Sequence, residues 1–86
     1  MKLTVVGTGY VGLVSGVGFA NLGNDVICLD IDHDKIAKLS TGELTIYEPG
    51  LGELFKRNLD NGRLRFVTDT PHAVQESEII FICVGT

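Results

Sequence analysis

The sequence predicts an α/β fold in which a partial parallel sheet of about four strands is covered by helices on both faces. Short apolar segments rich in β-branched residues alternate along the chain with segments whose apolar residues recur at helical spacing. One of these segments, residues 79–84, is apolar throughout, which is typical of a strand buried inside a parallel sheet. With 86 residues and 44% hydrophobic content, the chain can form one globular domain at most.

The first half of the chain predicts two strand–helix units. A short apolar strand over 3–6 ends at a glycine, and a helix is expected over 10–22 before the stop signal Gly23-Asn24. Glycines inside this helix lower its propensity, so we expect them to serve close backbone packing. A second strand is expected over 25–30, and Asp32 can cap a helix that ends near Ser40. The apolar side of the first helix is predicted to include Val11, Val14, Val17 or Phe19, and Leu22.

The second half predicts a further helix, a strand, a short helix and a last strand. Pro49 is expected to open a helix with Leu51, Leu54, Phe55 and Leu59 on one side and Asn61-Gly62 at its end. Strands follow over 64–68 and 79–84, with a short helix starting at Thr70-Pro71 between them. Right-handed crossovers give the strand order 3-2-1-4. The last strand is apolar enough for the middle of a sheet, so its second neighbour is expected beyond this chain.

Charge and polarity exclude two kinds of partner. Eleven acidic and seven basic side chains give a net charge of -4, with no basic stripe for a nucleic acid. Residues 3–24 carry no charge, but glycines and polar residues interrupt the apolar block that a membrane span requires. We therefore expect no nucleic-acid partner and no membrane insertion.

The reactive side chains do not form a metal or nucleophilic site. Cys28 and Cys83 stand singly in apolar segments, which predicts core positions and a reducing, cytoplasmic environment. His33 and His72 have no second ligand at metal spacing. No residue of the chain is predicted to be catalytic, and no metal is expected.

A glycine-rich turn at residues 7–12 predicts a binding site for a dinucleotide. Residues 7–12 form a GxGxxG between a predicted strand and a predicted helix, and an acid ends the next strand about twenty residues later. Gly7 permits the tight turn, Gly9 leaves room for a pyrophosphate, and Gly12 lets the helix lie close to the sheet. Near Tyr10 and Val11, the helix N-terminus offers unpaired backbone N–H groups to that diphosphate. The alternative is a tight loop that binds no ligand.

Asp30, the acid that ends the second strand, indicates which dinucleotide binds. Its carboxylate can accept two hydrogen bonds from the adenosine ribose of NAD but would repel the 2′-phosphate of NADP. Ile31 and Asp32 supply no arginine for that phosphate, so NAD is the expected cofactor. Lys35 can reach the same ribose or a phosphate, or it can remain a solvated surface lysine.

Several segments together resemble one enzyme family. These are residues 7–13, Leu29-Asp30-Ile31-Asp32 with Lys35, the Tyr-Glu-Pro-Gly-Leu segment at 47–51, and the closing Val84-Gly85-Thr86. They resemble the N-terminus of the UDP-glucose/GDP-mannose dehydrogenase family, and the likeness covers essentially the whole chain. It implies that 1–86 is the N-terminal part of an NAD-binding Rossmann domain, with the other domains of the parent enzyme outside it.

By this resemblance, the parent enzyme would oxidise UDP-glucose to UDP-glucuronate in two NAD-dependent steps, through an aldehyde held by a downstream cysteine. Neither Cys28 nor Cys83 matches that cysteine. The resemblance also implies Thr86 as a cofactor residue, a UDP-sugar substrate, a role in polysaccharide biosynthesis and a homo-oligomer. Tyr47 favours UDP-glucose over GDP-mannose.

Three alternatives remain open from the sequence. The parent could be a GDP-mannose or UDP-N-acetylmannosamine dehydrogenase. A regulatory nucleotide-sensing module shares the glycine turn, but the long segment 40–63 with its extra helix favours the enzyme. An FAD-binding half-domain is disfavoured by the segment at 47–51.

Overall fold

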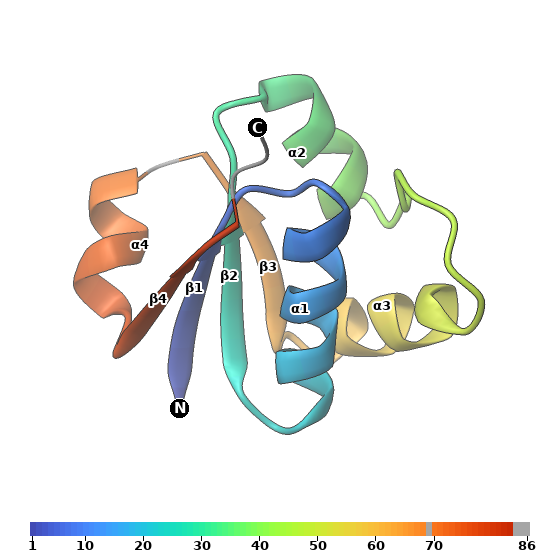
Figure 1. Cartoon of the computed structure of the whole chain (residues 1–86), viewed down its shortest axis with the longest axis horizontal. Helices are drawn as coiled ribbons and strands as arrows, with labels where there is room; N and C mark the ends of the chain where they lie inside the picture. The colour runs from blue at the N-terminus through green and yellow to red at the C-terminus, as the bar shows by residue number, and fades with distance from the viewer. Residues whose placement is uncertain (69, 84–86) are drawn as a thin grey trace.

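The fold is a four-stranded parallel sheet with the strand order β3-β2-β1-β4, which confirms the predicted topology. The computed structural model describes residues 1–68 and 70–83. Figure 1 shows the sheet with its strands and helices labelled along the chain. The elements are β1 (Lys2–Val6), α1 (Tyr10–Asn21), β2 (Asp25–Leu29), α2 (His33–Ser40), α3 (Leu51–Asp60), β3 (Leu64–Val67), α4 (Thr70–Glu76) and β4 (Ile79–Ile82).

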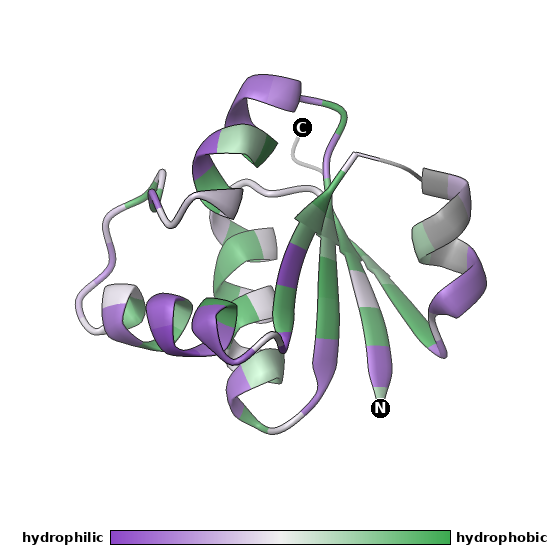
Figure 2. Ribbon diagram, turned by 180° about the vertical axis from the view of Figure 1, so that it is seen from behind, coloured by the Kyte–Doolittle hydropathy of each residue, from purple (hydrophilic) through white to green (hydrophobic). Residues whose placement is uncertain are grey.

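Helices cover both faces of the sheet, as predicted. In Figure 1, α1, α2 and α3 lie on one side and α4 lies on the other. The core on the first side joins buried residues of β1, β2 and β3 to apolar residues of these three helices, and Figure 2 shows the strands coloured mostly as hydrophobic. On the second side, the hydroxyl of Thr4 in β1 donates a hydrogen bond of 3.3 Å to the carbonyl oxygen of Ala73 in α4. Successive side chains of a strand point to opposite faces of the sheet, so each one packs against the helices on one face only.

The predicted apolar side of α1 is only partly right, because Val17 is buried and Val14 and Phe19 pack against the core, but Val11 and Leu22 do not. Val11 and Leu22 are 61% and 80% exposed, whereas the buried residues of the helix include Leu13 and Val17. Gly16 explains the difference, because a Cβ added there would lie 2.7 Å from Sγ of Cys28 in β2. Glycines of α1 face the sheet and let the helix lie close to it. The buried side of the helix therefore differs from the side on which the largest apolar side chains recur.

Some boundaries differ from the prediction. Helix α3 begins at Leu51 rather than Pro49, because Gly50 adopts a left-handed conformation with a φ of 83° immediately before it. The amide of Leu51 donates to the carbonyl oxygen of Glu48 at 3.0 Å, which closes the turn that precedes the helix. Strand β4 ends at Ile82, although the amide of Cys83 still donates to the carbonyl oxygen of Val6 at 2.8 Å.

Strand β4 lies at an edge of the described sheet and pairs there with β1 in parallel. Ile82 is 74% exposed, and Ile79 and Ile80 are also exposed. An apolar strand at a sheet edge offers unpaired backbone groups next to apolar side chains. This edge is therefore prone to association with another strand.

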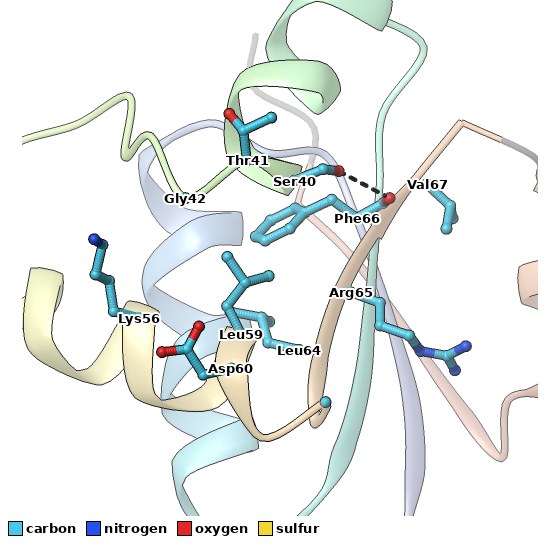
Figure 3. A pocket seen from close by; sticks show the side chains of 11 residues that line it. Ser40, Thr41, Gly42, Lys56, Leu59, Asp60, Leu64, Arg65, Phe66 and Val67 are labelled. Carbon is cyan, nitrogen blue, oxygen red and sulfur yellow. Dashed lines mark hydrogen bonds between the residues drawn. The ribbon is translucent and has the colours of Figure 1, made fainter.

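A groove of about 660 Å³ lies beside the opposite edge strand, β3 (Figure 3). The groove is bounded by the C-terminal end of α2, by the C-terminal half of α3 and by strand β3. None of its lining residues is one of the predicted site residues. The lining consists of Ser40, Thr41, Gly42, Lys56, Leu59, Asp60, Gly62, Leu64, Arg65, Phe66 and Val67.

Candidate functional site

The pairing of β1 with β2 brings the glycine turn next to Asp30. Val6 and Leu29 are register partners at the carboxyl ends of these strands, so the residues that follow them leave the sheet side by side. The amide of Gly7 donates to the carbonyl oxygen of Leu29 at 2.7 Å. Gly7 has a φ of 102°, which other residues rarely adopt, and it turns the chain from the strand toward α1. Figure 1 shows both segments at the same end of the sheet.

The first turn of α1 has free backbone donors. Gly9 is the N-cap and has no side chain that could accept their hydrogen bonds, and the first turn contains no acidic residue. The first hydrogen bond of the helix runs from the amide of Leu13 to the carbonyl oxygen of Gly9 at 2.9 Å. Among the described residues, the amides of Tyr10, Val11 and Gly12 have no hydrogen-bond partner. These donors and the positive end of the helix dipole favour an anion.

Two glycines of the turn have different reasons to be glycine. A Cβ on Gly12 would lie 1.8 Å from the carbonyl oxygen of Gly7, so the folded turn itself excludes a side chain there. The contact that Gly12 relieves is thus with the turn, whereas Gly16 provides the close approach to the sheet that the sequence analysis assigned to Gly12. A Cβ on Gly9 would meet nothing within 4 Å. The fold does not require glycine at position 9, and the space beside it is open for a ligand.

Asp30 is held by three hydrogen bonds from the chain. Its Oδ2 accepts from the amide of Thr8 at 2.9 Å and from the hydroxyl of Thr8 at 2.7 Å, while Oδ1 accepts from the amide of Asp32 at 3.0 Å. A carboxylate has about four lone-pair sites. One site, on Oδ1, therefore stays free in this arrangement, whereas the sequence predicts two hydrogen bonds to the ribose.

The surroundings of Asp30 keep it ionised. Partial burial acts to raise the pKa of Asp30, but the hydrogen bonds from Thr8 and from the amide of Asp32, together with the positive charge of Lys35, lower it overall. Lys35 stands in the first turn of α2, where its amide donates to the capping carboxylate of Asp32 at 3.1 Å. Lys35 thus lies near enough to Asp30 for its positive charge to lower the pKa of that carboxyl. The predicted cap at Asp32 is confirmed.

Tyr10 and Val11 expose their side chains at the start of α1. The hydroxyl of Tyr10 donates a hydrogen bond of 2.7 Å to Oε2 of Glu48, in the connection between α2 and α3. This bond and the negative charge of Glu48 raise the pKa of the Tyr10 phenol. Thr86, the remaining predicted cofactor residue, lies outside the described residues.

The two cysteines differ in their distance from the glycine turn, and Cys83 lies beside it, because a Cβ on Gly12 would be 3.6 Å from the Cβ of Cys83. Cys28 is buried and Cys83 is partly buried, and both are free thiols. Burial raises the pKa of Cys28 to about 12, so this thiol stays protonated and unreactive. The described residues contain no group of three or more histidine, cysteine or acidic side chains that could hold a metal ion. Within residues 1–68 and 70–83, no helix has the length and apolar character to cross a membrane.

Two residues that organise the site, Thr8 and Glu48, are not among the predicted site residues. Thr8 is one of the unspecified positions of the GxGxxG turn, although a hydroxyl two residues beyond a strand can reach the acid that follows the neighbouring parallel strand. Glu48 belongs to the segment at 47–51, but no pattern in the sequence pairs it with Tyr10; it lies in a long connection, which is a type of segment that often carries function.

In the comparison with known proteins, one family profile matches the whole chain. The sequence profile described as UDP-glucose/GDP-mannose dehydrogenase family, NAD binding domain, matches residues 1–86. UDP-glucose 6-dehydrogenase TuaD of Bacillus subtilis (strain 168) is 54% identical over 85 residues, which are 99% of this chain and 18% of that protein. A UDP-glucose 6-dehydrogenase of Rhizobium meliloti (strain 1021) is 52% identical over 86 residues, 100% of this chain and 20% of that protein. The chain thus spans about a fifth of the length of these relatives.

Solved structures agree with the sequence match. A ternary complex of GDP-mannose dehydrogenase from Pseudomonas aeruginosa superposes with a TM-score of 0.95 at 40% identity, over 100% of this chain and 20% of that chain. A UDP-glucose dehydrogenase from the archaeon Pyrobaculum islandicum superposes with a TM-score of 0.92 at 45% identity, over 99% of this chain and 20% of that chain. The predicted Rossmann-type fold, family and cofactor are therefore confirmed. The chain belongs to the UDP-glucose/GDP-mannose dehydrogenase family, and its residues 1–86 match the NAD binding domain of that family.

Proposed function

We propose that this chain is the cofactor-binding part of an NAD-dependent UDP-glucose 6-dehydrogenase, which oxidises UDP-glucose to UDP-glucuronate with two NAD. One observation supports the binding role above all. The uncapped first turn of α1 presents free amides beside the open space at Gly9. The ionised carboxylate of Asp30 is hydrogen-bonded to Thr8, in the glycine turn that leads into this helix. The names of the curated relatives support the choice of UDP-glucose as the substrate of the parent enzyme.

The residues present fit NAD. The amides of Tyr10, Val11 and Gly12 would hold the diphosphate, and Asp30 would accept from the adenosine ribose through its free site. Lys35 would add a positive charge beside that ribose. When bound, NAD accepts a hydride from the alcohol carbon of the substrate. The chain itself binds and orients the cofactor, and the groups that act on the sugar would come from the rest of the parent enzyme.

GDP-mannose is the second candidate substrate. The GDP-mannose dehydrogenase of Pseudomonas aeruginosa matches the fold of this chain at a TM-score of 0.95. Turnover of UDP-glucose, GDP-mannose and UDP-N-acetylmannosamine by the complete enzyme would separate the candidates. Preference for a sugar other than UDP-glucose would overturn that part of the proposal.

We also propose that the parent enzyme is a cytoplasmic homo-oligomer that belongs to polysaccharide biosynthesis. The two free thiols are in keeping with a reducing compartment. The oligomer and the pathway rest on the likeness to the family. Sedimentation of the complete enzyme tests the assembly, because a monomer would contradict it.

A direct test of the binding role compares three chains, the wild type, Gly9→Ala and Gly18→Ala. Gly9 has a φ of -74° and free space around its Cβ position, so alanine should leave the melting temperature nearly unchanged. The added methyl would lie where the diphosphate is expected, so Gly9→Ala should lose NAD binding in calorimetric titration. Gly18 also has free space around it but lies near the far end of α1, so Gly18→Ala should bind as the wild type does.

A second test addresses the cofactor choice. Asp30→Ala should weaken NAD binding by about 1 to 3 kcal/mol, the scale for a lost hydrogen bond to a charged group. The wild-type chain should bind NAD more tightly than NADP, ATP or FAD. Normal NAD binding by Gly9→Ala, or a preference for ATP or FAD, would contradict the proposed function.

A further inference from the structure

Thr8 makes the closest contacts to Asp30 and belongs to the glycine turn. Its hydroxyl and its amide both donate to the same carboxylate oxygen, Oδ2, at 2.7 and 2.9 Å. Asp30 stands at the end of β2 and Thr8 follows β1, so these two bonds join segments that are 22 residues apart in sequence. No other side chain donates a hydrogen bond to Asp30 within the described part of the chain.

The exposure of the two residues separates their roles. Thr8 is 1% exposed, whereas Asp30 is only partly buried. The Thr8 side chain is therefore closed off from a ligand, while the carboxylate that it holds remains accessible. Since the Thr8 amide is also used by Asp30, it is not available to a diphosphate.

The two oxygens of the Asp30 carboxylate differ in how many hydrogen bonds they accept. Oδ2 accepts two hydrogen bonds from Thr8, and Oδ1 accepts one from Asp32, which leaves the free site on Oδ1. Losing the hydroxyl bond would leave only the two amides to orient the group. A carboxylate that rotates loses more entropy when it binds a ribose, so a fixed one binds more tightly.

We infer that Thr8 is a positioning residue for the cofactor: it orients the Asp30 carboxylate so that Oδ1 faces the ribose, without itself touching the dinucleotide. This inference rests on the proposed function, because it takes Asp30 as the residue that recognises the ribose. It predicts that one hydroxyl, buried beside the glycine turn, controls the affinity for NAD.

The test uses Thr8→Val, which keeps the shape and the amide but removes the hydroxyl, and Thr8→Ser, which keeps the hydroxyl. Two quantities are measured on each chain: the Kd for NAD by calorimetry and the pKa of the Asp30 carboxyl by NMR titration. Thr8→Val should bind NAD about two- to tenfold more weakly, the scale for fixing one additional side chain on binding. It should also raise the pKa of Asp30, because the carboxylate loses its strongest donor while the charge of Lys35 remains. Thr8→Ser should restore both values.

Each outcome bears on the inference. Equal or tighter NAD binding by Thr8→Val, or failure of Thr8→Ser to restore affinity, would overturn it. If Thr8→Val does not fold, Thr8→Ala removes the same hydroxyl with less bulk, and the same expectations apply. Failure of the wild-type chain to bind NAD would instead refute the proposed function. In that case the pKa of Asp30 in the two variants still reports whether the hydroxyl holds the carboxylate.

Discussion

The hydroxyl of Tyr10 donates a hydrogen bond of 2.7 Å to Oε2 of Glu48, across 38 residues of sequence. Tyr10 is the first residue of α1, and Glu48 lies in the irregular connection between α2 and α3. The bond therefore fixes this connection to the start of the helix that carries the free amides. It also places a negative charge beside the phenol, and the bond and the charge together raise the pKa of Tyr10.

Replacing Glu48 by glutamine should lower the pKa of the Tyr10 phenol toward its ordinary value. Glutamine can still accept a hydrogen bond, but it carries no charge to oppose ionisation of the phenol. The measurement is the ultraviolet absorbance of tyrosinate against pH, in a Tyr47→Phe background that leaves a single tyrosine. Glu43→Gln removes the same charge elsewhere in the connection and should leave the titration unchanged. An unaltered titration in Glu48→Gln would show that the two side chains do not interact in solution.

Alanine at Gly12 and at Gly18 should change stability in opposite directions. At Gly12 the new Cβ would meet the Gly7 carbonyl oxygen at 1.8 Å, so the turn must shift, at a cost of about 1 to 3 kcal/mol or more. At Gly18 the Cβ meets nothing within 4 Å, and the higher helix propensity of alanine should add up to about 1 kcal/mol. Urea denaturation of both variants gives these differences, and equal stability of the two would contradict the described packing of the turn.

Cys28 should resist thiol reagents in the folded chain while Cys83 reacts. Burial, with a smaller effect from Cys83, raises the pKa of Cys28 to about 12, so the folded state favours the protonated thiol. That contribution to stability is complete below the unfolded pKa of about 8.5, and it is lost as the pH rises toward the folded value. Mass spectrometry after alkylation at mildly alkaline pH should find one modified cysteine, and none in a Cys83→Ser variant. Rapid native modification of Cys28 would show that β2 opens readily.

The exposed edge of β4 should cause the chain to self-associate at high concentration. Ile79, Ile80 and Ile82 lie exposed along this edge, where another strand can pair. Sedimentation velocity should show association that decreases in Ile82→Lys. Ile31→Lys is the matched control, because Ile31 is 86% exposed but lies outside the sheet. A wild-type chain that stays monomeric at all concentrations would contradict this prediction.

The strand order was predictable because it depends on patterns that are local in the sequence. Each strand is a short apolar segment, and each crossover follows a general rule of handedness. The buried side of α1 was not predictable in the same way. Glycine adds nothing to an apolar periodicity, yet Gly16 occupies the closest contact with β2, and Val11 is left outside.

The site was predictable only in part. The turn at Gly7 and the acid at Asp30 have a fixed spacing, which a sequence displays directly. Thr8 and Glu48 act through hydrogen bonds to residues 22 and 38 positions away, and those depend on how two strand ends and one irregular connection lie in space. Away from the site, Asn58 is a similar case, because its buried side-chain amide in α3 donates to Oδ1 of Asn21 in α1 at 3.4 Å, 37 residues away in sequence.

The bare first turn of α1 makes the cofactor a substitute for a missing capping residue. A helix normally satisfies its first amides with a serine, threonine or acid of its own, and here a diphosphate would take that place. A ligand that binds only the folded state adds about 2.7 kcal/mol of stability when its free concentration is a hundred times its Kd. The free energy of unfolding of this chain would then depend on the concentration of its cofactor.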